Sequence, residues 1–346
     1  MSLYVCLWNF CAIVYTNSMS RLLEIKDLRT VFDTAKGRIS AVDGVSLSLN
    51  SGDTMGIVGE SGCGKTMLAL SIMNLIPANG KIVNGEIIFA GKDLLKLSSE
   101  EMRQKRGSEI AMVFQEPMTS LNPVLRIGEQ IAEAIRLHQK LPPKEALDLS
   151  IDQLREVGID DPEKIVRGYP HQLSGGMRQR VMIAMAMSCH PQLLLADEPT
   201  TALDVTIQAQ ILGLITSLKE KNNMAVILIT HDLGIIAQAA RHVAVMYAGK
   251  IVESSTVENI FDHPLHPYTR GLIESMPARC VASSDRENYL KTIPGNVPSL
   301  YNLPAGCRFF DRCLVAQKEC NQEEPTLKEI EAGHFVSCWK HPGNIN

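Results

Sequence analysis

Three short motifs in a fixed order constrain the fold of this 346-residue chain more than any other feature. A glycine-rich loop, GESGCGKT, occupies residues 59–66, the octapeptide LSGGMRQR occupies residues 173–180, and LLLADEP occupies residues 193–199. A loop of this pattern alone would occur by chance in roughly one chain in a hundred of this length. Chance does not account for all three motifs in this order, so the first is interpreted as a phosphate-binding loop.

The residue types of this loop suit a nucleotide. Its glycines let successive backbone N–H groups point at phosphate oxygens, and the helix that follows adds its positive N-terminal end. Lys65 would neutralise the β and γ phosphates, and Thr66 would offer its hydroxyl to Mg²⁺. We therefore expect ATP and Mg²⁺ as ligands. The residues expected to contact the nucleotide here are Gly59, Glu60, Ser61, Gly62, Cys63, Gly64, Lys65 and Thr66.

Two adjacent carboxylates follow residues 192–196, a predicted buried strand whose last four residues are apolar. This strand would carry them to the sheet edge where the loop lies, because ligands of open α/β sheets bind beyond the carboxyl ends of the strands. Asp197 is predicted to hold Mg²⁺, through water. Glu198 is predicted to orient and deprotonate the water that attacks the γ-phosphate.

The alternation of apolar runs with helical stretches predicts an α/β fold with a parallel core. A helical subdomain is expected at about 118–185, with a proline-containing break at 141–144, and a coil-rich tail from about residue 261. Parallel strands are expected at 54–58, 110–114, 192–196 and 225–230, and antiparallel strands covering one edge at 22–28 and 41–49.

From about residue 22 to about residue 339, the chain resembles the ATP-binding subunits of bacterial ABC importers for dipeptides and oligopeptides. The resemblance implies a P-loop ABC ATPase domain over residues 19–260. The string HPLHPYTRGLIESMP, residues 263–277, is similar to the C-terminal extension of the oligopeptide and dipeptide branch, so residues 261–346 are assigned to such an extension. Nickel importers share this branch, which leaves a nickel or other small-solute importer as the alternative.

Three further site residues follow from the resemblance. Gln115 matches the Q-loop glutamine, which touches the metal and the nucleophilic water. His231 matches the switch histidine, which reaches the γ-phosphate. Phe32 stands where the family places an aromatic residue, usually Tyr, that stacks on adenine; packing within a β-layer is the alternative for this ring.

The octapeptide implies a partner subunit. Ser174 precedes the apolar helical stretch 181–188, so it is predicted to be a helix N-cap followed by unbonded N–H groups, which form an anion site. By resemblance, Ser174, Gly175 and Gly176 bind the γ-phosphate held by a second ATPase subunit, in a head-to-tail sandwich. Asp204 would communicate across that seam. The resemblance also implies a related, non-identical ATPase partner, two membrane permease chains and an extracytoplasmic peptide-binding protein.

Four cysteines lie near the C-terminus: Cys307, Cys313, Cys320 and Cys338, separated by five, six and seventeen residues. Disulfides are not expected in a cytosolic protein. A structural zinc site usually includes a C-x₂₋₄-C pair, which is absent here, whereas four thiolates can hold a four-iron four-sulfur cluster. The resemblance favours the cluster; zinc and free thiols remain alternatives.

Charge and the N-terminus limit the other partners. A net charge of −4 and an isoelectric point near 6.2 argue against nucleic acid or an anionic membrane surface as the main partner. Residues 1–18 contain an apolar run shorter than the roughly 20 residues that span a bilayer. They are predicted to be a non-native or disordered leader before a start at Met19, with a peripheral membrane contact as the alternative. We expect the chain at the cytoplasmic face of the membrane. A soluble ABC ATPase acting on ribosomes or DNA would usually show two cassettes or a long coiled-coil insertion, and this chain shows neither.

Overall fold

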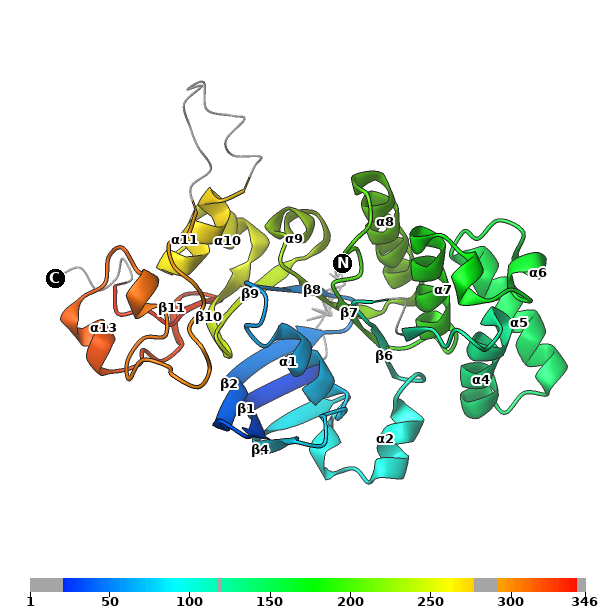
Figure 1. The fold of residues 1–346 in the computed structure, drawn as a ribbon, viewed down its shortest axis with the longest axis horizontal. Helices are drawn as coiled ribbons and strands as arrows, with labels where there is room; N and C mark the ends of the chain where they lie inside the picture. The colour runs from blue at the N-terminus through cyan, green and yellow to red at the C-terminus, as the bar shows by residue number, and fades with distance from the viewer. Residues whose placement is uncertain (1–20, 117–119, 277–291, 341–346) are drawn as a thin grey trace, which may run out of the picture.

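The computed structural model describes residues 21–116, 120–276 and 292–340, which form two β-sheets with helices around them (Figure 1). The larger sheet has the strand order β11-β12-β10-β9-β3-β8-β7-β6, in which β9 spans His242–Tyr247. Its four predicted parallel strands are confirmed and are buried along their whole length, as continuous apolar runs require. They are β3 (Thr54–Val58), β6 (Ile110–Val113), β7 (Leu193–Asp197) and β8 (Ala225–Thr230).

The predicted antiparallel layer is also confirmed, and it is a separate sheet with the strand order β2-β1-β4-β5. Helix α1 (Lys65–Ile72) lies between the two sheets, because its buried Leu68, Ala69 and Ile72 pack into one apolar core with side chains of both. This packing fixes the helix that follows the phosphate loop. The strands of the smaller sheet are β1 (Arg21–Thr34), β2 (Gly37–Asn50), β4 (Gly80–Phe89) and β5 (Lys92–Asp93).

Helices occupy the range where a helical subdomain is expected, at the end of the molecule drawn in green in Figure 1. In α4, Ile127, Ile131 and Ile135 are fully buried, as their spacing predicts. The first helix ends at Gln139 and is followed by Lys140, which has a φ of 55°, and the next helix begins at Pro143. The helices are α4 (Ile127–Gln139), α5 (Pro143–Glu156), α6 (Pro162–Ile165) and α7 (Gly175–Met187).

The C-terminal extension is more regular than the predicted coil-rich tail. It contains two strands, β11 (Lys328–Glu331) and β12 (His334–Val336), and β12 pairs antiparallel with β10 (Lys250–Thr256), so the extension continues the main sheet. Long-range strand pairing of this kind leaves little local signal in a sequence. Helix α10 (Val257–Asp262) leads into the extension, whose described part also contains η3 (Phe310–Arg312) and the helices α11 (Pro267–Glu274) and α13 (Lys318–Gln322).

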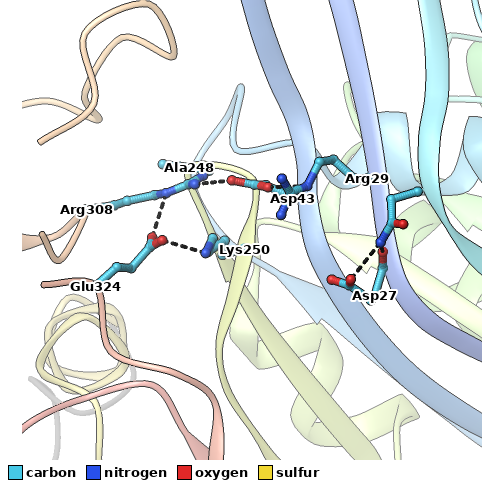
Figure 2. Close-up of polar contacts among 8 residues, drawn as sticks. Asp27, Arg29, Asp43, Ala248, Lys250, Arg308 and Glu324 are labelled. Atoms are coloured by element: carbon cyan, nitrogen blue, oxygen red, sulfur yellow. Dashed lines mark hydrogen bonds and ion pairs between the residues drawn. The ribbon is translucent and has the colours of Figure 1, made fainter. Parts of the chain in front are cut away.

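Arg308 anchors the extension to both sheets (Figure 2). Its guanidinium pairs with Asp43 of β2, donates to the Ala248 carbonyl at 2.5 Å and pairs with Glu324 at 2.9 Å. Lys250 pairs with the other oxygen of Glu324 at 2.6 Å. Because the Arg308 side chain is only 9% exposed, these contacts are shielded from solvent and hold the extension in place.

The leader, residues 1–18, and Pro277 at the end of the string 263–277 lie outside the described residues. Within the described part of the chain, no helix has the length and apolar character needed to cross a membrane.

Candidate functional site

The predicted nucleotide-site residues meet at one edge of the main sheet. The phosphate loop follows β3, His231 follows β8, Asp197 ends β7, and Gln115 comes two residues after β6. These four strands are parallel neighbours, so their carboxyl ends lie side by side. Residues separated by more than a hundred positions in the sequence are thereby brought to the same place.

The phosphate loop requires glycine at two positions. Gly59 and Gly64 have φ angles of 155° and 106°, which L side chains rarely adopt. A Cβ at Gly59 would lie 2.1 Å from the Met246 carbonyl oxygen, and one at Gly64 would lie 2.2 Å from that of Ala41. The backbone therefore takes this curled path only with glycine, as a loop that presents its N–H groups to an anion must.

Lys65 is buried at the first turn of α1, and its ammonium group lies inside the curl of the loop. Its Nζ donates to the carbonyl oxygen of Gly59 at 2.7 Å and to that of Glu60 at 3.0 Å. Cys63 is fully buried beside it, and burial raises the pKa of its thiol, although Lys65 partly opposes this. The thiol is therefore kept protonated and shielded from oxidants.

Asp197 fits a magnesium ligand. It is 1% exposed, and its Oδ1 atom is buried without a hydrogen-bond partner. Burial raises the pKa of this carboxyl, and a hydrogen bond from Thr66 partly offsets the rise. Because a buried, unpartnered carboxylate oxygen is costly, a cation bound here would satisfy Oδ1. Thr66 and Gln115 are the other side chains predicted to contact this metal.

Glu198 gathers the other predicted catalytic side chains around its carboxylate. Its Oε2 accepts from Gln115 Nε2 at 3.1 Å, and its Oε1 lies 3.3 Å from His231 Nδ1. Its backbone has a φ of 45°, an uncommon conformation for a non-glycine residue that often marks functional sites. Burial raises the pKa of Glu198, but hydrogen bonds from Thr201 and His231 lower this pKa by more than burial raises it. The net shift is downward, which favours the ionised carboxylate.

Thr201 belongs to this site and was not predicted from the sequence. Its hydroxyl donates to Glu198 Oε2 at 2.8 Å, so it helps fix the orientation of the carboxylate. The only local signal is its position three residues after Glu198, in a turn closed by the hydrogen bond from Thr201 N to Glu198 O. A hydroxyl residue at this spacing is too common to single out without the structure.

Ser174 of the octapeptide and Asp204 both lie at exposed helix starts. Ser174 is the N-cap of α7, as predicted, and its Oγ accepts from Met177 N at 3.3 Å. Asp204 caps α8 (Val205–Asn222) in the same way, with its Oδ1 accepting from Ile207 N at 2.9 Å. A Cβ at Gly176 would lie 2.9 Å from Ile207, so the two helix starts pack closely.

Phe32 lies in β1 and is 9% exposed. Its ring packs so closely on Gly80 of β4 that a Cβ there would lie 2.6 Å from Phe32 Cε1. The ring is therefore largely buried, and its stacking on adenine stays a prediction.

The four C-terminal cysteines line one small pocket, together with Phe310 and Trp339. The pKa of Cys307 is raised to about 12 and that of Cys338 to about 11, mainly by burial and to a smaller extent by the neighbouring cysteines. Across residues 21–116, 120–276 and 292–340, no group of three or more His, Cys, Asp or Glu side chains is placed to hold a metal ion. The thiols share a pocket, but they do not form a single-ion site in this structure.

Comparison with known proteins agrees with the geometry. The ABC transporter family model matches residues 42–201, which include the loop, the signature octapeptide and both carboxylates. The model of the oligopeptide/dipeptide transporter C-terminal region matches residues 252–320. AppD, an oligopeptide transport ATP-binding protein of Bacillus subtilis, is 50% identical over 322 residues, which cover 93% of this chain and 97% of AppD. The chain belongs to this ABC ATPase family.

Other comparisons extend this assignment. The oligopeptide transport ATP-binding protein OppD of Haemophilus influenzae is 48% identical, with 95% of this chain and all of OppD covered. Among solved structures, the dimeric ATP-binding cassette MJ0796 bound to ADP and Pi matches with a TM-score of 0.62 and 25% identity, covering 68% of this chain and 98% of the cassette. As an ABC ATPase, the chain binds and hydrolyses ATP.

Proposed function

We propose that this ABC ATPase powers the import of dipeptides or oligopeptides. The observation that carries the proposal is the C-terminal region, because residues 252–320 match the oligopeptide/dipeptide transporter model, and AppD and OppD are named for oligopeptide transport. The chain would lie at the cytoplasmic face of the membrane, bound to two permease chains. An extracytoplasmic peptide-binding protein would deliver the peptide to these permease chains. Nickel or another small solute is the alternative cargo.

The proposed domains follow from the same assignment. Residues 19–260 form the ATPase domain, with a helical subdomain at about 118–185, and residues 261–346 form the extension. The family match at 42–201 lies within the first part, and the match at 252–320 begins near the end of the first part and covers much of the second.

In the proposed mechanism, Glu198 is the general base. Its carboxylate is ionised, so it can accept a proton from the water that attacks the γ-phosphate of ATP. Gln115 and Thr201 hold Oε2 and leave the orientation of the carboxylate little freedom, while His231 lies next to Oε1. From there His231 would contact the γ-phosphate of bound ATP.

The phosphate oxygens of ATP would be bound by the phosphate loop and Lys65. The loop N–H groups and Lys65 would bind the β and γ phosphates, and the Lys65 ammonium would exchange its loop carbonyl partners for phosphate oxygens. Thr66 and Asp197 would hold Mg²⁺, which neutralises charge on the phosphates when bound. Fixed groups therefore meet the charge that develops during hydrolysis.

The second proposed element is a non-identical ATPase partner. Ser174, Gly175 and Gly176 lie at an exposed N-terminus of the 13-residue helix α7, and Asp204 lies at the exposed start of α8. The N-terminus of a helix attracts anions, so we propose that the N-terminus of α7 binds the γ-phosphate of the ATP held by the partner's phosphate loop. ATP would thus join the two subunits, and its hydrolysis would release them.

Uptake by cells lacking the gene for this chain tests the proposal. The wild-type chain should restore ATP-dependent uptake of a labelled tripeptide, and Glu198→Gln, present at the same abundance, should not. Labelled Ni²⁺ is offered to the same cells as the competing cargo. Restored Ni²⁺ uptake without peptide uptake would overturn peptide import while leaving the ATPase assignment intact.

For the extension we propose a four-iron four-sulfur cluster held by Cys307, Cys313, Cys320 and Cys338. The support is that the four cysteines line one pocket and that four thiolates can hold such a cluster. Protein purified without oxygen should be brown, with about four iron and four sulfide per chain, and Cys313→Ser should remove the colour. A colourless protein, whether it carries stoichiometric zinc or no metal, would refute the cluster.

A further inference from the structure

The C-terminal extension contacts the phosphate loop directly, although the two are far apart in the sequence. Arg312 lies in η3 of the extension, and Glu60 is the second residue of the loop. Arg312 Nη1 lies 2.5 Å from Glu60 Oε2, and Arg312 Nη2 lies 2.9 Å from Glu60 Oε1. The pair is therefore bidentate, which is the strongest and most directional form of an arginine–carboxylate contact.

The surroundings of Arg312 fix its guanidinium before any nucleotide binds. Its side chain is 5% exposed, its Nε donates to the Pro294 carbonyl at 2.8 Å, and its Nη1 also reaches the Tyr247 hydroxyl at 3.3 Å. The guanidinium carbon lies 5.7 Å from the ring centres of both Tyr247 and Phe309. A buried cation with so many partners has one orientation, and that orientation points at Glu60.

A second residue of the extension holds the loop backbone. The Tyr268 hydroxyl, at the start of α11, accepts from the backbone N–H of Glu60 at 2.9 Å. The carbonyl of the same peptide unit belongs to Gly59 and accepts from Lys65 Nζ at 2.7 Å. The peptide between Gly59 and Glu60 is thus held on one side by the extension and on the other by the lysine that would meet the phosphates.

We propose that Arg312 and Tyr268 are positioning residues for ATP binding: Arg312 cancels the charge of Glu60 within the anion-binding loop, and Tyr268 fixes the peptide that orients Lys65. The physical reason is that Glu60 puts a carboxylate into a loop that must bind a polyanion. An unpaired carboxylate there would repel the phosphates. The extension is thereby part of the nucleotide site rather than a separate appendage.

Arg312→Gln tests the charge role in the full-length chain assembled with its transporter partners. The KM for MgATP should rise by about tenfold, which is what the loss of roughly 1.4 kcal/mol of binding predicts, and kcat should change little. The Kd of a fluorescent ATP analogue should rise in parallel. Arg270→Gln is the matched control, because Arg270 is an exposed arginine of the same extension that donates to the Pro264 carbonyl. It should leave both constants unchanged.

The decisive variant is Glu60→Gln combined with Arg312→Gln. If Arg312 acts by cancelling the charge of Glu60, the double variant should recover most of the lost MgATP affinity. A purely structural role predicts no recovery. A double variant as weak as Arg312→Gln, or a KM unchanged by Arg312→Gln, would overturn the proposal.

Tyr268→Phe provides a second test of the proposal if the Arg312→Gln variant does not fold. It removes only the hydroxyl that accepts from Glu60, so the fold should persist, with a thermal unfolding midpoint close to that of the wild type. KM should rise by about threefold, in line with one modest hydrogen bond, again with little change in kcat. An unchanged KM in a folded Tyr268→Phe protein would remove Tyr268 from the loop-positioning role.

Discussion

His266 makes the stability of this protein depend on pH. It is the N-cap of α11, is 1% exposed, and its Nδ1 accepts from Tyr268 N at 3.1 Å. Nδ1 can accept this bond only while it carries no proton. Burial lowers the pKa of His266 from 6.5 to about 4, although Glu253 opposes the shift. The folded state therefore favours the neutral ring.

The pKa shift of His266 sets the sign and the size of the change in unfolding free energy with pH. Since the pKa of His266 is lower in the folded than in the unfolded chain, the unfolded chain binds more protons between pH 6.5 and pH 4. The contribution to stability is complete above pH 6.5 and is lost as pH falls toward 4. A shift from 6.5 to about 4 is worth about 3 kcal/mol of unfolding free energy.

His266→Asn isolates this contribution, because asparagine keeps a capping acceptor but does not titrate. Urea unfolding followed by circular dichroism should show that the wild type loses about 3 kcal/mol more than the variant between pH 7 and pH 4. His171→Asn, at an exposed position, is the control and should keep the wild-type pH dependence. Parallel pH curves for the wild type and His266→Asn would refute the reasoning.

Three further predictions concern the nucleotide site and the N-terminus. Glu198→Gln should retain ATP binding but slow hydrolysis by about 10² to 10⁴-fold, the usual cost of losing a general base, and near-normal turnover would exclude Glu198 from that role. Gly64→Ala should abolish binding of a fluorescent ATP analogue, because its Cβ would lie 2.2 Å from the Ala41 carbonyl oxygen; wild-type affinity would show that the loop can move aside. A chain that starts at Met19 should support transport as the full chain does, and loss of transport at normal abundance would give residues 1–18 a function.

The parts of the fold that the sequence predicted carry strong local signals. Continuous apolar runs marked β3, β6, β7 and β8, and the residues at their ends could be placed together because parallel strands end at one edge. Ser174 was recognisable as a cap because the helix that follows it is apolar. These features depend on residues within about one element of each other.

The parts that the sequence did not predict depend on contacts between distant segments. Strand β12 is only three residues long and pairs with β10, and Arg312 reaches Glu60 across 252 positions. No periodicity in either segment encodes such a partner. Arg312 is the immediate neighbour of Cys313, so a residue of the cysteine-containing extension touches the loop.

The most direct test of the central claim is nucleotide occupancy at each ATP site of the assembled transporter. In a head-to-tail sandwich, Ser174→Arg in this chain should impair the site built on the partner's phosphate loop, whereas Lys65→Ala should impair the site on this chain's own loop. Site-specific crosslinking of an azido-ATP analogue, or a structure of the assembly, resolves the two sites. If Ser174→Arg emptied only the site that contains Lys65 of the same chain, the sandwich would be wrong for this protein.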